Sequence, residues 1–317
     1  MSTLIKWFPD RPGMATGIAI MGFGGGALIA SPWSAQMLSS FGTGHSGIAL
    51  AFLVLGLSYA VFMSLGVLLV RVPRPQEAAA DGPAAVTGVR VSAAGALRTP
   101  QFWCLWIVLC TNVTAGIGIL EKAAPMITDF FADSSAPVSA SAAAGFVALL
   151  SAANMAGRIG WSSTSDLIGR KNIYRLYLGA GALMYLVLAL FGDASKPLFV
   201  LCALVILSFY GGGFATVPAY LKDLFGAHQV GAIHGRLLTA WSTAGVLGPL
   251  IVNWIADRQK DAGRSGASLY TLSFGIMIGL LVVGLIANEF VRPVHPRHHV
   301  PAPREAADVV RQQPESA

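Results

Sequence analysis

The stretch between Arg11 and Arg71 contains 59 consecutive residues without a single Asp, Glu, Lys or Arg. A helix that crosses a bilayer needs about 20 mainly apolar residues, so this stretch is long enough for two crossings. Residues 39–47, with the sequence SSFGTGHSG, predict a turn that divides it, because Gly and Ser favour turns. We therefore predict two membrane helices, near residues 15–38 and 47–70.

Six further uncharged stretches follow later in the chain, and each predicts one more membrane helix. These helices are expected near residues 101–120, 138–161, 174–192, 198–221, 234–256 and 268–290. Their apolar runs are continuous rather than alternating, which argues against a transmembrane β-barrel. Charged residues make up only 11% of the chain, against about 25% in soluble domains. The predicted fold class is therefore an all-α membrane protein with eight transmembrane helices.

Two segments lack the character of membrane helices. Residues 73–100 are rich in Ala, Gly and Pro and predict a cytoplasmic linker, and residues 293–317 predict a disordered cytoplasmic tail. The linker separates two helices within residues 1–72 from a six-helix bundle within residues 101–292. The tail contains His295, His298 and His299, and we favour solvated side chains over a metal site because nothing nearby completes a ligand set.

The distribution of Lys and Arg predicts the orientation in the membrane. If the N-terminus is cytoplasmic, the inner regions contain 15 of these residues and the outer loops contain 5. The positive-inside rule then places both termini on the cytoplasmic side of a cell inner (plasma) membrane. The same asymmetry accounts for the net charge of +6 through contact with anionic lipids, so no nucleic-acid partner is expected.

Arg175 and Arg236 lie within the first three positions of their predicted helices, so Arg158 is the one Lys or Arg that falls deep inside a predicted membrane helix. Ser151, Asn154, Arg158 and Ser162 follow one another at spacings of three, four and four, so they share one helix face. A planar guanidinium donates two parallel hydrogen bonds to a carboxylate. We predict that Arg158, Asn154 and Ser151 bind a small organic anion. The alternative is that Arg158 extends to the inner interface and leaves only its stem in the membrane.

The sequence DLIGRKN, residues 166–172, predicts a charged turn between two helices. Asp166 is expected near the cytoplasmic end of one helix, Gly169 permits a tight turn, and Arg170 and Lys171 face the inner headgroups. Such a cluster either latches neighbouring helices and breaks when the protein opens inward, or anchors the topology through its basic residues alone. Both interpretations remain open at this point.

Several segments resemble known transporters. The sequence WFPDRPGMATGIAIMGFGGGALIASP (residues 7–32) resembles the region around the start of the fifth helix of a major facilitator superfamily transporter, and DLIGRKN resembles the superfamily's loop motif between the eighth and ninth helices. Residues 118–131 (GILEKAAPMITDFF) and residues 211–249 resemble the oxalate/formate antiporter family. The resemblance extends over residues 1–292. It implies the C-terminal two-thirds of a twelve-helix fold, without its first four helices, and secondary transport of a small organic anion by alternating access.

The resemblance also implies residues of the site. Related anion carriers place an arginine in the helix that contains Arg158. The oxalate-exchanging pattern has a lysine in its eleventh helix, and the matching position here is Trp241. One arginine with a large aromatic surface fits a monocarboxylate with an apolar body better than oxalate. Tyr210 is a further candidate for substrate contact. The alternatives are that Trp241 packs in the core and that Tyr210 anchors a helix at the interface.

The remaining motifs predict neither an enzyme nor a cofactor. The sequence contains no Walker motif, no catalytic-triad spacing and no metal-ligand spacing, and its three cysteines fall in predicted membrane helices. The expected partners are a small organic anion and membrane lipids, and a monomer is expected if the chain is complete. A second function class is a truncated, inactive or partner-dependent membrane scaffold, because four expected helices are missing.

Overall fold

The computed structural model describes residues 2–42, 44–71 and 89–300. This part of the chain is helical apart from its loops and one isolated β-bridge. The long helices are α2 (Pro12–Phe41), α3 (His45–Leu69), α6 (Pro100–Glu121), α8 (Ala140–Ile168), α9 (Arg170–Phe191), α10 (Lys196–Phe225), α12 (Thr239–Asp261) and α13 (Thr271–Phe290). The short ones are α1 (Ser2–Trp7), α5 (Ala93–Ala96), α7 (Ala123–Phe130), α11 (Val230–Leu237) and the 3₁₀ turns η2 (Gly266–Leu269) and η3 (Pro296–His298).

The helices have the length and composition of membrane spans. Within the described residues, seven spans are long and apolar enough to cross a membrane: α3, α6, α8, α9, α10, the α11–α12 pair and α13. α2 contains 30 residues, which exceeds the length of about 20 that a crossing needs. The predicted all-α membrane fold is therefore confirmed.

Local sequence signals explain where several of these helices begin. The side chains of Thr99, Ser139 and Ser195 each accept a hydrogen bond from a backbone N–H in the first turn of α6, α8 and α10. A hydroxyl at this position satisfies one of the N–H groups that a helix start leaves without a partner. Proline follows in the first turn of α6 and α10, where its missing N–H costs nothing.

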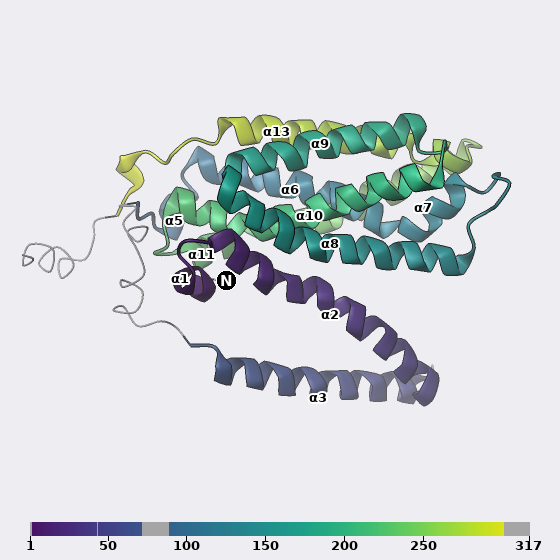
Figure 1. The fold of residues 1–317 in the computed structure, drawn as a ribbon, viewed down its shortest axis with the longest axis horizontal. Helices are drawn as coiled ribbons and strands as arrows, with labels where there is room; N and C mark the ends of the chain where they lie inside the picture. The colour runs from purple at the N-terminus through teal and green to yellow at the C-terminus, as the bar shows by residue number, and fades with distance from the viewer. Residues whose placement is uncertain (1, 43, 72–88, 301–317) are drawn as a thin grey trace, which may run out of the picture.

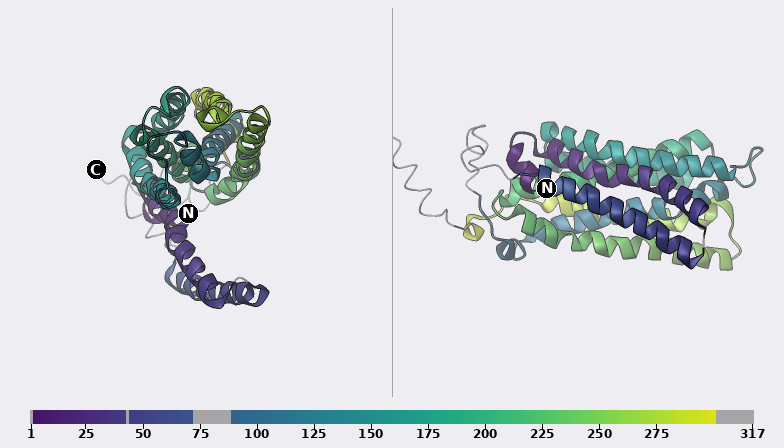
Figure 2. Two further views of the ribbon diagram at one scale, coloured as in Figure 1. Left: turned by 90° about the vertical axis from the view of Figure 1, so that its right-hand side faces the viewer. Right: turned by 90° about the horizontal axis from the view of Figure 1, so that it is seen from below.

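Six of the long helices form one bundle, and α2 and α3 form an arm beside it. Figure 1 shows α6, α8, α9, α10 and α13 running side by side, with α2 diverging from them along its length. Viewed along its long axis, the bundle is a ring from which α2 and α3 extend on one side (Figure 2). The end at which α2 begins and α8 and α10 finish is called the Asp166 end below. The side chains of α3 are mostly exposed.

Close contact between α8 and α10 organises the bundle around the candidate site. A Cβ atom at Gly157 of α8 would overlap the backbone of Ser208, and one at Gly211 of α10 would overlap the backbone of Asn154. In membranes, helices associate largely through such close packing of small residues. The two glycines thus bring the Asn154–Arg158 segment of α8 against α10.

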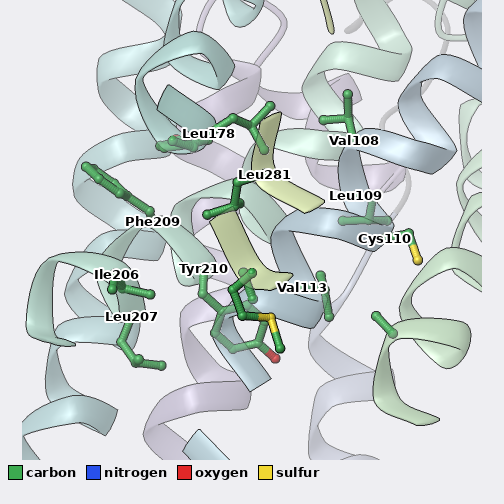
Figure 3. Close-up of a cluster of buried hydrophobic side chains, with 14 of the residues drawn as sticks. Val108, Leu109, Cys110, Val113, Leu178, Ile206, Leu207, Phe209, Tyr210 and Leu281 are labelled. Carbon is green, nitrogen blue, oxygen red and sulfur yellow. The ribbon is translucent and has the colours of Figure 1, made fainter. Parts of the chain in front are cut away.

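Buried apolar side chains of α6, α9, α10 and α13 belong to the core of the bundle. Leu109 and Val113 of α6, Leu178 of α9 and Leu281 of α13 belong to one buried cluster with Tyr210 (Figure 3). Tyr210 is pressed so closely onto α6 that a Cβ atom at Gly116 would overlap it. This packing leaves Tyr210 little freedom to change rotamer.

The structure corrects several predicted boundaries. The helix predicted near residues 138–161 continues to Ile168, so Asp166 lies in its last turn. The helix predicted near residues 234–256 is divided at Leu238 into α11 and α12. α1 and α7 were not predicted, because six to eight residues are too few to produce a clear periodic pattern.

The described part of the tail differs from the disorder predicted for it. Val294 is buried, and the N–H of Val300 donates to the carbonyl of Arg90 at 2.6 Å. Val91 in turn forms an antiparallel bridge with His299. Residues 293–300 are therefore ordered by pairing with the end of the linker. Residues 72–88 and 301–317, which contain the rest of the predicted linker and tail, lie outside the described residues.

Candidate functional site

Arg158 lies at the junction of α8, α10 and α2, with a side chain only 3% exposed. Its Nε donates to Oδ1 of Asn154 at 2.9 Å, one turn earlier in α8. Its Nη1 donates to the backbone carbonyl of Ile20 in α2 at 3.0 Å. The guanidinium is thus held between α8 and α2, and Asn154 orients it. A guanidinium at membrane depth must face a partner or water.

An aromatic surface from α10 and α12 lies beside this guanidinium. The Cζ atom of Arg158 is 5.6 Å from the ring centroid of Phe214, a cation–π distance. The same Phe214 ring lies 5.4 Å from that of Trp241. The side chain of Trp241 also interacts with that of Tyr210. The guanidinium of Arg158 therefore lies near a group of three aromatic residues: Phe214, Trp241 and Tyr210.

The sequence-based site residues are only partly brought together. Asn154 lies at Arg158, and Tyr210 and Trp241 lie against each other, but Ser151 does not extend the polar contact. The hydroxyl of Ser151 donates to the carbonyl of Val147 in its own helix, at 3.1 Å. Phe214 was missed by the sequence analysis, although it follows Tyr210 by one helical turn on the same face of α10.

The first two turns of α2 pack against α8 and α10 through small residues. Cβ atoms at Gly13 and Gly17 would overlap backbone atoms of α8. Thr16 is fully buried, and its hydroxyl donates to the carbonyl of Ala215 in α10 at 3.0 Å. Further along α2 the contact is lost, since a Cβ atom at Gly22 would meet nothing within 4 Å. The Asp166 end is therefore closed by residues 13–20 of α2.

Asp166 caps the start of α2 from the neighbouring helix. Its two carboxylate oxygens accept hydrogen bonds from the backbone N–H groups of Gly13 and Met14, at 3.0 and 2.9 Å. α2 has no capping side chain of its own, because its N-cap residue is Arg11. A carboxylate at a helix start also interacts favourably with the helix dipole. This contact joins residues that are more than 150 positions apart in the sequence.

Further charged residues surround this carboxylate. Arg170 pairs with Asp166, and its Nε contacts Oδ2 of Asp223 at the end of α10 at 3.1 Å. Lys222 donates to the carbonyl of Pro9, just before α2, at 2.8 Å. Asp166, Arg170, Lys222 and Asp223 are called the Asp166 cluster below. Gly169 has a φ of 87° and separates α8 from α9 as a single residue.

Lys171 belongs to a different group. Its Nζ donates to the carbonyls of Glu289 and Val291 at the end of α13, at 2.7 and 3.1 Å. Arg175 forms a two-pronged pair with the Glu289 carboxylate, at 2.5 and 2.6 Å. Lys171 therefore joins α9 to α13, whereas the Asp166 cluster joins α8, α9 and α10 to α2.

A sequence profile of the Major Facilitator Superfamily matches residues 1–249. Curated relatives include the "Oxalate:formate antiporter" of Oxalobacter formigenes, 27% identical over 78% of this chain and 56% of its own length. They also include an uncharacterised transporter of the same superfamily, YhjX of Escherichia coli (25% identical, 74% of this chain, 55% of its own length). "Apicoplast pyruvate carrier 1" of Toxoplasma gondii is 24% identical over 73% of this chain and 51% of its own length. The chain thus spans about half the length of these relatives.

Among solved structures, the fucose:proton symporter FucP of E. coli has a similar fold. The TM-score is 0.65, the identity is 12%, and the match covers 90% of this chain and 70% of FucP. At this identity the likeness concerns the fold alone.

Proposed function

Because this chain belongs to the major facilitator superfamily, whose members are transporters and not enzymes, we propose that it carries a small organic anion across the membrane by alternating access. In this proposal Arg158 binds the carboxylate of the anion and Asn154 orients the guanidinium. The names of two relatives, an oxalate:formate antiporter and a pyruvate carrier, refer to small carboxylates. They support the same class of substrate here.

The observation that carries the proposal is the buried guanidinium at the contact between α2 and the six-helix bundle. Among its partners are an amide oxygen, a backbone carbonyl and an aromatic face. Neither oxygen carries a full charge, and a carboxylate forms stronger hydrogen bonds with a guanidinium than neutral acceptors do. A buried guanidinium with neutral acceptors is therefore suited to binding an anionic ligand.

The aromatic residues support a monocarboxylate with a small apolar body. Phe214 contacts both Arg158 and Trp241, so a carboxylate on Arg158 would have its remaining atoms next to aromatic rings. Trp241 also occupies the position where the oxalate-exchanging pattern has a lysine. A second carboxylate would meet an apolar surface there and would lose its hydration without compensation. We therefore propose pyruvate-like or formate-like anions over oxalate.

Replacing Arg158 with Lys should lower transport of pyruvate by about tenfold or more at limiting substrate, because hydrogen bonds to charged groups contribute about 1.5–3 kcal/mol. Lysine keeps the charge but lacks the planar fork. The measurement is uptake of labelled pyruvate into proteoliposomes at equal protein density. Wild-type kinetics in Arg158→Ala would rule out the role of Arg158.

The Asp166 cluster is proposed to be a gate that latches α2 to the bundle on the cytoplasmic side. Its contacts with Gly13, Met14 and Pro9 all close the same end. They must break for α2 to move away from α8. Simple anchoring by basic residues does not require an acidic residue to cap another helix, so the contacts of Asp166 favour the gating interpretation.

The orientation is tested by cysteine accessibility. We expect Ser46→Cys and Ser265→Cys, which are exposed at the end opposite Asp166, to react with an impermeant maleimide added to intact cells. Ala227→Cys, exposed at the Asp166 end, should react only after the membrane is opened. The opposite labelling pattern would reverse the proposed orientation.

A further inference from the structure

The hydrogen bond between Arg158 and the carbonyl of Ile20 links the candidate substrate site directly to α2. Arg158 belongs to α8, and Ile20 lies on the α2 face that also contains Gly13, Thr16 and Gly17. These are the residues through which α2 closes the Asp166 end. The guanidinium is therefore at once a candidate ligand for the substrate and a contact of the closed gate.

A substrate carboxylate and the Ile20 carbonyl compete for the same group. The carbonyl of Ile20 is a neutral acceptor, whereas a carboxylate carries a full charge and forms shorter and stronger hydrogen bonds. The Nε of Arg158 donates to Asn154 and its Nη1 donates to Ile20, so a carboxylate that binds the Nη side of the guanidinium competes with Ile20 for Nη1. Binding through the fork then draws Nη1 away from α2.

We propose that the substrate carboxylate replaces the Ile20 carbonyl on Arg158, and that this exchange releases α2 from α8 and opens the gate at the Asp166 end. The inference rests on the proposed function, since it requires that Arg158 binds the substrate. The exchange couples binding to opening, because a ligand shifts a conformational equilibrium by its differential affinity for the two states. By reciprocity, any change that weakens the Ile20 contact must strengthen carboxylate binding.

Opening of the gate is measured as the distance between two spin labels, attached at Ile18→Cys on α2 and Leu167→Cys on α8. Both positions are exposed near the Asp166 end, at 50% and 86%, and the native Cys104, Cys110 and Cys202 are replaced by Ala. Sodium pyruvate should increase the long-distance population of this pair in the full-length protein. Pyruvamide, which has the same shape without the charge, should leave the distances unchanged.

The Ile20 carbonyl can be weakened as an acceptor without changing any side chain. Replacing Met21 with its α-hydroxy acid converts this carbonyl from an amide to an ester. We expect the open population without ligand to rise and the midpoint of the pyruvate titration to fall by severalfold, because an ester carbonyl is the weaker acceptor. If the contact between Arg158 and Ile20 had only a structural role, weakening it would not improve the affinity for pyruvate. The matched control is the same replacement at Ala30, which alters the carbonyl of Ile29, a residue with an exposed side chain.

Two results would overturn the inference, and only the second would also overturn the proposed function. If pyruvate binds in an Arg158-dependent manner but neither the distances nor the ester variant's affinity changes, the exchange is wrong and the proposed function stands. If pyruvate, formate and oxalate all fail to raise the thermal stability of the wild-type protein, or do so equally in Arg158→Ala, the proposed function fails and the exchange fails with it.

Discussion

A Gly17→Ala variant should lose transport almost completely while remaining folded in the membrane. The added Cβ would overlap the backbone carbonyl of Arg158 and the hydroxyl of Ser162. The hydroxyl can rotate away, but the backbone of α8 cannot, so α2 must move outward. Overpacking of this kind costs about 1–3 kcal/mol. A cost of about 2 kcal/mol shifts the equilibrium between closed and open gate by about thirtyfold toward the open form.

The spin-label pair on Ile18 and Leu167 measures this shift, and uptake of labelled pyruvate measures its consequence. The control is Gly160→Ala in α8, two positions after Arg158, where a Cβ atom meets nothing within 4 Å. Both substitutions raise helix propensity equally, so the difference between them isolates the contact with α8. Normal transport in Gly17→Ala would show that residues 13–20 of α2 need not approach α8 during the cycle.

A Trp241→Lys variant should change the preferred substrate from a monocarboxylate to oxalate. Phe214 contacts both Trp241 and Arg158, so an ammonium at position 241 would lie beside the same ring as the guanidinium. A second charged hydrogen bond contributes about 1.5–3 kcal/mol, which predicts a rise of at least about tenfold in the ratio of oxalate to pyruvate transport. Pyruvate transport itself should fall, because the aromatic surface is smaller.

The ratio is measured by competition of the two unlabelled anions against labelled formate in the same proteoliposomes. Trp241→Phe is the matched control, since it keeps an aromatic ring without adding charge and should leave the ratio unchanged. An unchanged ratio in Trp241→Lys would place Trp241 outside the substrate site and favour the interpretation that it packs in the core.

Part of the site was predictable from helix periodicity. Asn154 and Arg158 are four residues apart, and four residues complete about one helical turn, so a side-chain hydrogen bond between them follows once the helix is recognised. Ser151 fits the same spacing but does not join them, because a serine hydroxyl in a helix readily donates to the carbonyl four residues earlier. Spacing alone does not distinguish these two outcomes.

The sequence by itself determined the class of protein, the approximate helices and the presence of Arg158 at membrane depth, because these depend on local composition and on the cost of placing a charge in an apolar medium. Only the tertiary structure decided what that cation and Asp166 contact. The acceptor in α2 is the carbonyl of Ile20, and the donors to Asp166 are the N–H groups of Gly13 and Met14. Every residue except proline carries the same backbone N–H and C=O groups. No pattern of side chains in the sequence therefore identifies which of these backbone groups a distant helix will contact.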